Sequence, residues 1–136
     1  MLDLPIMGTN APREHQRVIR KLIVGLDKLY ILGSIPYEPF PETMLDEGKT
    51  SPTPDVILYD AVTDKDVVMV EISTTKGFNG DFNKVSELVE YYQLSEGFVY
   101  NYIKQQWRKY KRGVGEITEN PSFCDSIGYD LNEFLK

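Results

Sequence analysis

The chain has 136 residues and carries a net charge of −6 at pH 7, with a pI of about 4.8. Its length suits one domain spanning residues 1–136. Its 41% hydrophobic and 26% charged residues are ordinary for a soluble globular protein, which argues against disorder and coiled coil. The acidic balance counts against a protein whose main task is tight, nonspecific binding of nucleic acid, because phosphate neutralisation needs basic residues.

The residue types limit the sites that the chain can build. Cys124 is the only cysteine, so an intrachain disulfide and a thiolate metal cluster are excluded, and the single histidine, His15, argues against structural zinc. A bound metal would therefore take oxygen ligands, which favours Mg2+ or Mn2+. No apolar run approaches the ~20 residues of a membrane helix, and the first residues do not resemble a signal peptide. We expect a cytoplasmic protein with no membrane partner.

The first third of the chain predicts a helix followed by an extended segment. Residues 12–31 place apolar side chains at helical spacing on one face, with Gly33 as a stop and Gly25 marking a close packing contact. Three prolines in residues 35–42 exclude a central strand and favour an edge strand or an extended arm.

The middle of the chain combines strands with one helix. Residues 55–59 and 67–73 are rich in apolar, β-branched side chains and are joined by a short polar turn, which predicts an antiparallel hairpin. A helix over residues 81–94 precedes a strand over residues 98–102. This order of strand, helix and strand predicts a crossover and a parallel pairing within a mixed sheet.

Two carboxylates, Asp55 and Glu71, lie beside the apolar runs of the predicted hairpin. An acid next to a buried strand costs free energy unless something pairs with it. Two acids on adjacent strands, near one end of a sheet, provide oxygen ligands for a hard divalent cation, and such a cation is the core of a metal-dependent phosphodiesterase site. Taken alone, Asp55 also fits a simple turn residue after proline.

The ordered set of segments resembles the restriction-endonuclease-like superfamily, known by its PD-(D/E)xK motif, and within it the small bacterial Uma-two branch. The resemblance covers nearly the whole chain. It depends on the helix with His15, Tyr37-Glu38-Pro39-Phe40, Pro54-Asp55, Val70-Glu71-Ile72-Ser73, Asp81 with Lys84 ahead of Tyr91, and residues 128–134. It implies a single α/β domain of restriction-endonuclease-like fold, with a mixed four- to five-stranded sheet flanked by helices.

The resemblance also implies roles for individual residues. Asp55 and Glu71 would hold Mg2+ (or Mn2+) with help from the backbone carbonyl of Ile72. The motif's lysine should stand where this chain has Ser73, which is a departure from the superfamily pattern. Members of the Uma-two branch carry a lysine on the next helix instead, which corresponds to Lys84. A lysine there would orient the nucleophilic water or offset charge that develops in the transition state.

Other residues near these positions are candidates for substrate contact or support. Lys76 competes with Lys84 because it is closer in sequence to Glu71, although it lies in a glycine-bounded loop. Ser73 either hydrogen-bonds the loop backbone or supports the metal ligands. His15 either lines a cleft and contacts substrate or is a hydrogen-bonded core histidine.

The strand predicted over residues 106–111 lies in the one basic cluster that also contains aromatic residues. Trp107 and Arg108 are candidate nucleic-acid contacts through aromatic stacking and phosphate pairing. Both faces of the strand carry charge, so the alternatives are an exposed edge, where lysines discourage aggregation, and self-association. Residues 126–135 form an amphipathic tail that predicts a short helix against the body.

The combined pattern favours a Mg2+-dependent nuclease that hydrolyses DNA phosphodiester bonds, with Asp55, Glu71 and Lys84 as catalytic residues. The alternative is a catalytically inactive module of the same fold that serves in binding or assembly, including assembly as a homodimer. The acidic charge of the chain and the departure at Ser73 both favour this alternative.

Overall fold

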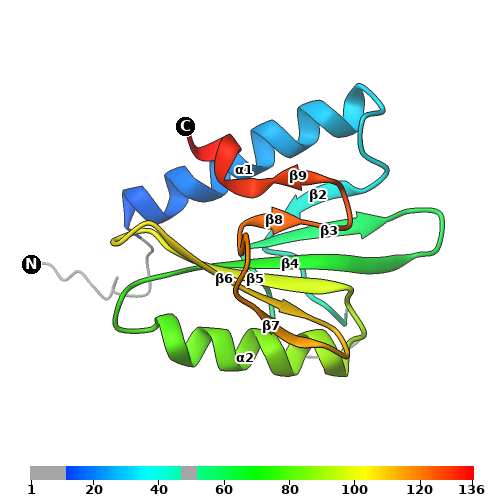
Figure 1. Cartoon of the computed structure of the whole chain (residues 1–136). Coiled ribbons are helices and arrows are strands. Elements are labelled where there is room, and N and C mark those ends of the chain that lie inside the picture. The colour runs from blue at the N-terminus through cyan, green and yellow to red at the C-terminus, as the bar shows by residue number, and fades with distance from the viewer. Residues whose placement is uncertain (1–11, 47–51) are drawn as a thin grey trace, which may run out of the picture.

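The computed structural model describes residues 12–46 and 52–136, which form a mixed sheet of six strands with two α-helices and a small second sheet (Figure 1). The elements in chain order are α1 (Arg13–Ile31), β2 (Glu38–Pro41), β3 (Val56–Asp60), β4 (Lys65–Ser73), α2 (Phe78–Tyr91), β5 (Glu96–Asn101), β6 (Gln106–Lys111), β7 (Gly115–Ile117), β8 (Phe123–Cys124), β9 (Tyr129–Asp130) and the 3-10 helix η1 (Leu131–Leu135). Of the helices in these two ranges, none has both the length and the apolar character needed to span a membrane.

The strand order across the large sheet is β2-β3-β4-β5-β6-β7. β3 and β4 form the predicted antiparallel hairpin, and β4 and β5 form the predicted parallel pair with α2 between them. β2 is the edge strand that its prolines predicted. The α/β class with a mixed sheet is confirmed, but the expected count of four to five strands was wrong. The additional strand β7 has three residues, too few to give an alternating pattern.

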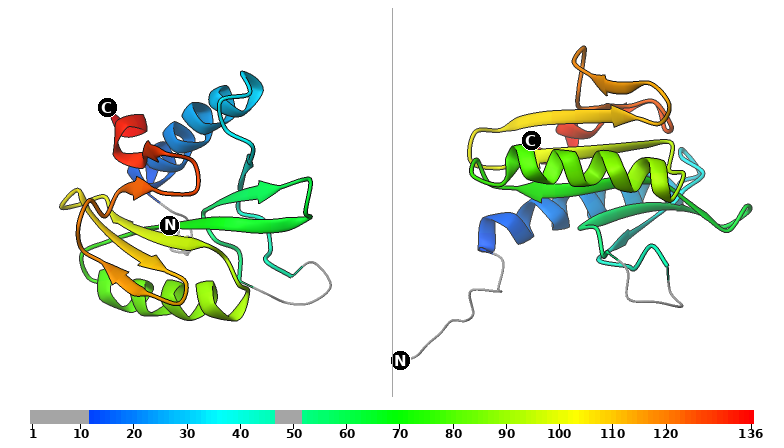
Figure 2. Two further views of the ribbon diagram at one scale, coloured as in Figure 1. Left: turned by 45° about the vertical axis from the view of Figure 1, so that its right-hand side comes forward. Right: turned by 90° about the horizontal axis from the view of Figure 1, so that it is seen from below.

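The two α-helices cover opposite faces of the sheet (Figures 1 and 2). Successive residues of β4 point to opposite faces, as in any strand. Val68, Val70 and Ile72 therefore pack in the core on the α1 side, whereas Met69 packs in the core on the α2 side. By the same alternation, Glu71 belongs to the α2 side of β4.

The end of the chain closes the core beneath α1. β8, β9 and η1 lie on the same face of the sheet as α1 (Figures 1 and 2). Phe134 of η1 packs on α1 at Gly25, where a Cβ atom would overlap the ring, so the predicted close contact at Gly25 is confirmed. α1 ends at Ile31. Gly33, two residues later, has a φ of +78°, and the N–H groups of Gly33 and Ser34 donate to the Tyr30 and Leu29 carbonyls in the last turn.

Two predicted features need correction. α2 starts at Phe78 and ends at Tyr91 rather than spanning residues 81–94. Its extra first turn forms because the Asp81 N–H donates to the Gly77 carbonyl, although Asn79 and Gly80 are poor helix formers.

β6 is not an exposed edge strand, because β7 pairs with it along its outer side. Its central residue, Lys109, is 2% exposed. The charge is tolerated there because the Lys109 ammonium lies 3.3 Å from the Glu96 carboxylate and 3.0 Å from Asp125.

Candidate active site

The two predicted carboxylates meet at one end of the sheet. β3 and β4 pair with Val56 opposite Val70, so Asp55, which precedes β3, stands next to Glu71. The backbone N–H of Asp55 donates to Glu71 Oε1 at 2.8 Å, and the backbone N–H of Ile72 donates to Asp55 Oδ2 at 2.8 Å. The Glu71 side chain is therefore held by the backbone of Asp55, and the Asp55 side chain is held by the backbone of β4 at Ile72.

Among the residues of this candidate site, Glu71 has the most strongly shifted pKa. Burial, and then the negative charge of Asp55, raise the pKa of Glu71 to about 7, although the hydrogen bond from the Asp55 N–H lowers it. Asp81 adds a further raising effect and Lys84 a lowering one. Two like charges held together in a partly buried place favour either a proton or a bound cation.

His15 approaches the carboxylate pair from the first turn of α1. Its Nε2 lies 3.4 Å from Asp55 Oδ2, and its ring packs edge-to-face against Tyr102 with centroids 6.2 Å apart. The hydrogen bond to Asp55 raises the pKa of His15 above its ordinary value, and burial opposes this effect. His15 therefore lies at the site, where it helps to hold Asp55.

Tyr102 is a residue of this site that the sequence analysis missed. It follows β5, and the parallel strands β4 and β5 end at the same edge of the sheet. The order of these strands was therefore the signal that could have placed Tyr102 beside residues 71–73.

Lys84 lies on the side of Glu71 that faces α2. It is exposed, and it lines a small pocket of about 20 Å³ together with Glu71. The other lining residues are Pro52, Thr53, Pro54, Met69 and Leu88. Lys76, the competing lysine, is exposed on the loop between β4 and α2 and is not part of this lining.

The oxygen atoms at this site suit Mg2+ better than a metal that needs a cage of side chains. Within residues 12–46 and 52–136, no group of three or more His, Cys, Asp or Glu side chains is arranged to hold a metal ion. Mg2+ usually keeps several waters and takes only one or two carboxylates from the protein. Asp55 Oδ1 and Glu71 Oε2 accept no hydrogen bond from the described residues, so both are available to such an ion.

Ser73, which stands where the superfamily motif has a lysine, is hydrogen-bonded to α2. Its hydroxyl is buried and donates to Asp81 Oδ2 at 2.7 Å. Ser73 therefore connects the end of β4 to the first turn of α2. This contact fixes the helix that carries Lys84 relative to the strand that carries Glu71.

Trp107 and Arg108 are engaged with other parts of the protein rather than with the carboxylate pair. The Trp107 indole N–H donates to Asn132 Oδ1 at 2.9 Å, beside η1. Arg108 donates two hydrogen bonds to Glu116, at 2.8 and 2.7 Å, and its guanidinium lies 3.9 Å from the ring centre of Phe82.

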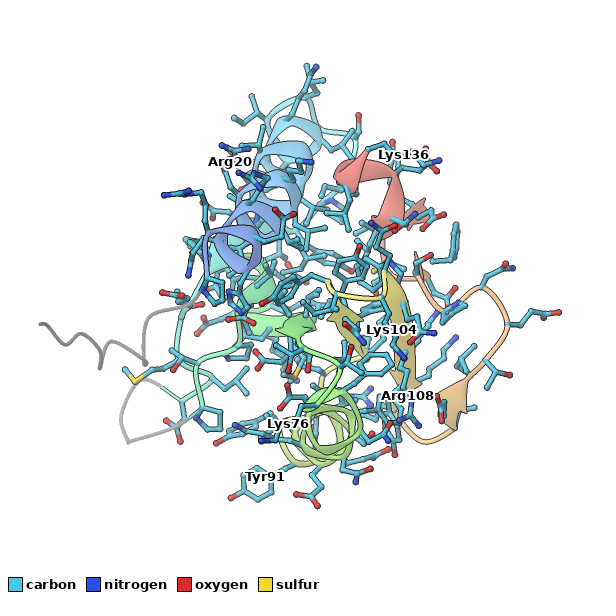
Figure 3. The ribbon with its side chains drawn as sticks, turned by 90° about the vertical axis from the view of Figure 1, so that its left-hand side faces the viewer. Arg20, Lys76, Tyr91, Lys104, Arg108 and Lys136 are labelled. Carbon is cyan, nitrogen blue, oxygen red and sulfur yellow. The ribbon has the colours of Figure 1, made fainter. Side chains whose placement is uncertain are left out.

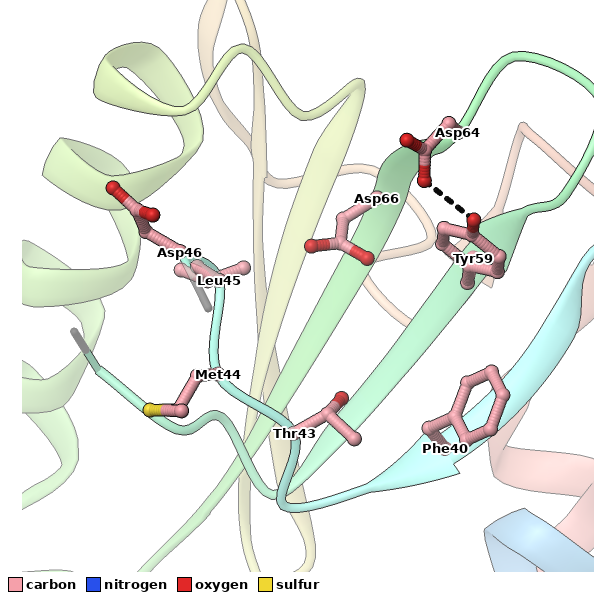
Figure 4. Close-up of a pocket in the computed structure, with 8 residues that line it drawn as sticks. All are labelled: Phe40, Thr43, Met44, Leu45, Asp46, Tyr59, Asp64 and Asp66. Carbon is pink, nitrogen blue, oxygen red and sulfur yellow. Dashed lines mark hydrogen bonds between the residues drawn. The ribbon is translucent and has the colours of Figure 1, made fainter. Parts of the chain in front are cut away.

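A larger open pocket of about 550 Å³ lies between β2, the segment after it, and the β3–β4 hairpin (Figure 4). Its lining residues are Phe40, Thr43, Met44, Leu45, Asp46, Tyr59, Asp64 and Asp66. None of the predicted site residues is among them. Three carboxylates in its lining make it a poor place for a phosphate group, because like charges repel.

The comparisons with known proteins agree with this architecture. No protein-family model matches the sequence, and no curated protein matches it. The fold matches a crystal structure from Anabaena variabilis ATCC 29413, described as a "putative nuclease belonging to DUF820", with a TM-score of 0.65 over 91% of this chain and 81% of that chain. The two sequences are 13% identical, so the likeness establishes the fold. This shared fold agrees with the restriction-endonuclease-like architecture that the sequence resemblance implied.

Proposed function

We propose that this chain is a Mg2+-dependent nuclease that hydrolyses DNA phosphodiester bonds. The observation that carries the proposal is the pair of hydrogen bonds that joins Asp55 and Glu71 at the end of the sheet. Further support comes from Lys84 beside Glu71, and from a fold shared with a protein that is itself described as a possible nuclease.

In this proposal each residue has a separate task. Asp55 and Glu71 would hold the metal ion together with the backbone carbonyl of Ile72. The chemistry that bound Mg2+ supplies is polarisation of a phosphoryl oxygen and a lower pKa for a water molecule. His15 keeps Asp55 oriented through its 3.4 Å contact. Lys84 offsets negative charge that develops on the phosphoryl group or orients the attacking water.

The test is nicking of a supercoiled plasmid with Mg2+ or Mn2+. We expect Asp55→Ala and Glu71→Ala each to lower the rate more than about 100-fold, because a catalytic metal contributes several kcal/mol to transition-state stabilisation. Glu119→Ala, which removes an exposed carboxylate between β7 and β8, is the matched control and should cleave like the wild type. Cleavage that survives Asp55→Ala or Glu71→Ala would contradict the assigned roles.

The second candidate is an inactive module for binding or assembly. The bond from Ser73 to Asp81 favours it, because this chain has a hydroxyl committed to a structural contact at the position of the motif lysine. Calorimetric titration with Mn2+ separates the two functions. Binding that Asp55→Ala abolishes favours the nuclease, whereas no binding at millimolar Mn2+ favours the inactive module.

A further inference from the structure

The charge of this protein is distributed unevenly, and α1 is its cationic element. The whole chain carries a net charge of −6, but α1 contains five Arg and Lys residues and two Asp and Glu residues. Its excess of three positive charges lies on the helix whose first turn carries His15 to the carboxylate pair. The strongest local positive potential on an element near the site is therefore expected along α1.

The arginines of α1 differ in what they contact. Arg17 is paired with Glu14 one turn earlier. Arg13 and Arg20 are exposed and have no ion-pair or hydrogen-bond partner in the described part of the chain. They are seven residues apart, so they lie on nearly the same face of the helix, about 10 Å apart along its axis. A guanidinium can bind a phosphate with two parallel hydrogen bonds, and this spacing allows each to meet a different phosphate.

The cations of β6 are committed to protein partners instead. Arg108 is paired with Glu116, and Lys109 is buried against Glu96. Lys111 lies 3.1 Å from Asp125. A phosphate would have to displace a carboxylate from each of these groups, so the basic strand is a weaker phosphate surface than its sequence indicates.

Further cations lie around the same end of the molecule as the carboxylate pair. Figure 3 views the end at which both α-helices begin, with Arg20 on α1, Lys76 before α2 and Lys104 in the turn between β5 and β6. Lys76 and Lys104 are both exposed and, like Arg20, have no ion-pair partner among the residues that the structure describes. Lys76 and Lys104 thus present cations beside the strand ends that are unpaired in the described chain, and Arg20 adds another on the solvent-facing side of α1, opposite the buried Leu22.

We propose that α1 is the principal nucleic-acid-binding surface, with Arg13 and Arg20 contacting the phosphates of a DNA duplex that crosses the carboxylate pair toward Lys76 and Lys104. This inference rests on the proposed nuclease function for the choice of DNA as ligand. It moves the main phosphate contact from β6 to α1. Binding of this kind depends on phosphate charge rather than base sequence, and it weakens steeply with salt.

The experiment measures the fluorescence anisotropy of a labelled DNA duplex of arbitrary sequence over about 50 to 200 mM salt, in EDTA and again in Ca2+. The full chain is compared with the double variant Arg13→Gln/Arg20→Gln. The matched control is Lys65→Gln/Arg112→Gln, which removes two exposed cations outside α1 near the opposite end of the molecule, at the start of β4 and directly after β6. The expected result is weaker binding by the arginine variant, with a salt slope smaller by about 2, and an unchanged slope for the control.

Three outcomes would overturn the proposal: no binding by the wild type in either buffer, wild-type binding by the arginine variant, or equal losses in both double variants. If the double variant does not fold, Arg20→Gln alone should reduce the slope by about 1. Because binding is measured without cleavage, the two proposals fail separately. Binding through α1 without metal-dependent nicking would refute the nuclease and retain the binding surface.

Discussion

At the scale of single residues, the site combines two carboxylates of like charge with the hydrogen-bond donors that hold them. Asp55 and Glu71 repel each other, yet two backbone N–H groups and His15 hold them together. Such an arrangement costs free energy in the absence of a cation, because negative charge is concentrated where water is partly excluded. Ionisable groups whose pKa is perturbed by burial and by a neighbouring charge cluster at functional sites.

The raised pKa of Glu71 gives a prediction for the metal-free protein. The pKa is about 7 when folded and 4.5 in its ordinary state, so the folded chain binds the proton more tightly. The stabilisation is complete below pH 4.5 and is lost as the pH rises through 7, by at most about 3 kcal/mol. Glu71→Gln keeps an acceptor for the Asp55 N–H and removes the charge. We expect it to raise the thermal midpoint in EDTA at pH 8 but not at pH 4.

A matched variant makes this measurement specific. Glu119→Gln removes an exposed carboxylate and should leave the midpoint unchanged at both pH values. If Glu71→Gln lowers the midpoint at pH 8, then the charged form of Glu71 stabilises the fold and the electrostatic account of the pair is wrong.

At the scale of elements, a buried ion pair joins the neighbouring strands β5 and β6, and no local sequence pattern indicates it. Glu96 on β5 and Lys109 on β6 are 1% and 2% exposed. Glu96 also accepts hydrogen bonds from the backbone N–H groups of Asp125 and Ser126, so the pair anchors the segment between β8 and β9 to the sheet. Removing one member of a buried pair leaves an uncompensated charge.

We therefore expect Lys109→Met to lower the free energy of unfolding by about 3 kcal/mol, measured by urea denaturation. Adding Glu96→Gln to Lys109→Met should recover part of this loss, and the double-mutant cycle gives the interaction energy. Lys65→Met, at an exposed lysine, should cost less than about 0.5 kcal/mol. Equal losses for the two lysine variants would mean that the Glu96–Lys109 pair contributes no more than a surface charge.

At the scale of the whole molecule, the sequence predicted the parts that depend on local pattern. The apolar runs beside Asp55 and Glu71 indicated a hairpin with both acids at one end, and the helix between β4 and β5 indicated the parallel pair. The burial of Lys109 could not be predicted, because it depends on Glu96 and Asp125, which are distant in the chain. The hydrogen bond from Trp107 to Asn132 could not be predicted for the same reason, because Asn132 is also distant in the chain.

The last element, η1, packs against the helix that carries His15. Phe134 packs on α1 at Gly25, and Lys21 of α1 donates to the carbonyl of Leu135 at 3.3 Å. α1 in turn carries His15 to Asp55. The packing of η1 is therefore expected to hold α1 on the sheet, and with it one side of the carboxylate pair.

We expect Phe134→Ala to lower the free energy of unfolding by about 2 to 3 kcal/mol, somewhat less than for a fully buried phenylalanine, because Phe134 is partly exposed. Tyr91→Ala is the control, since Tyr91 is 79% exposed and its loss should cost less than about 0.5 kcal/mol. Urea denaturation measures both. If η1 holds α1 in place, Phe134→Ala should also increase hydrogen exchange in the first turns of α1. Destabilisation without that increase would place the loss in the core alone and leave the site independent of the chain end.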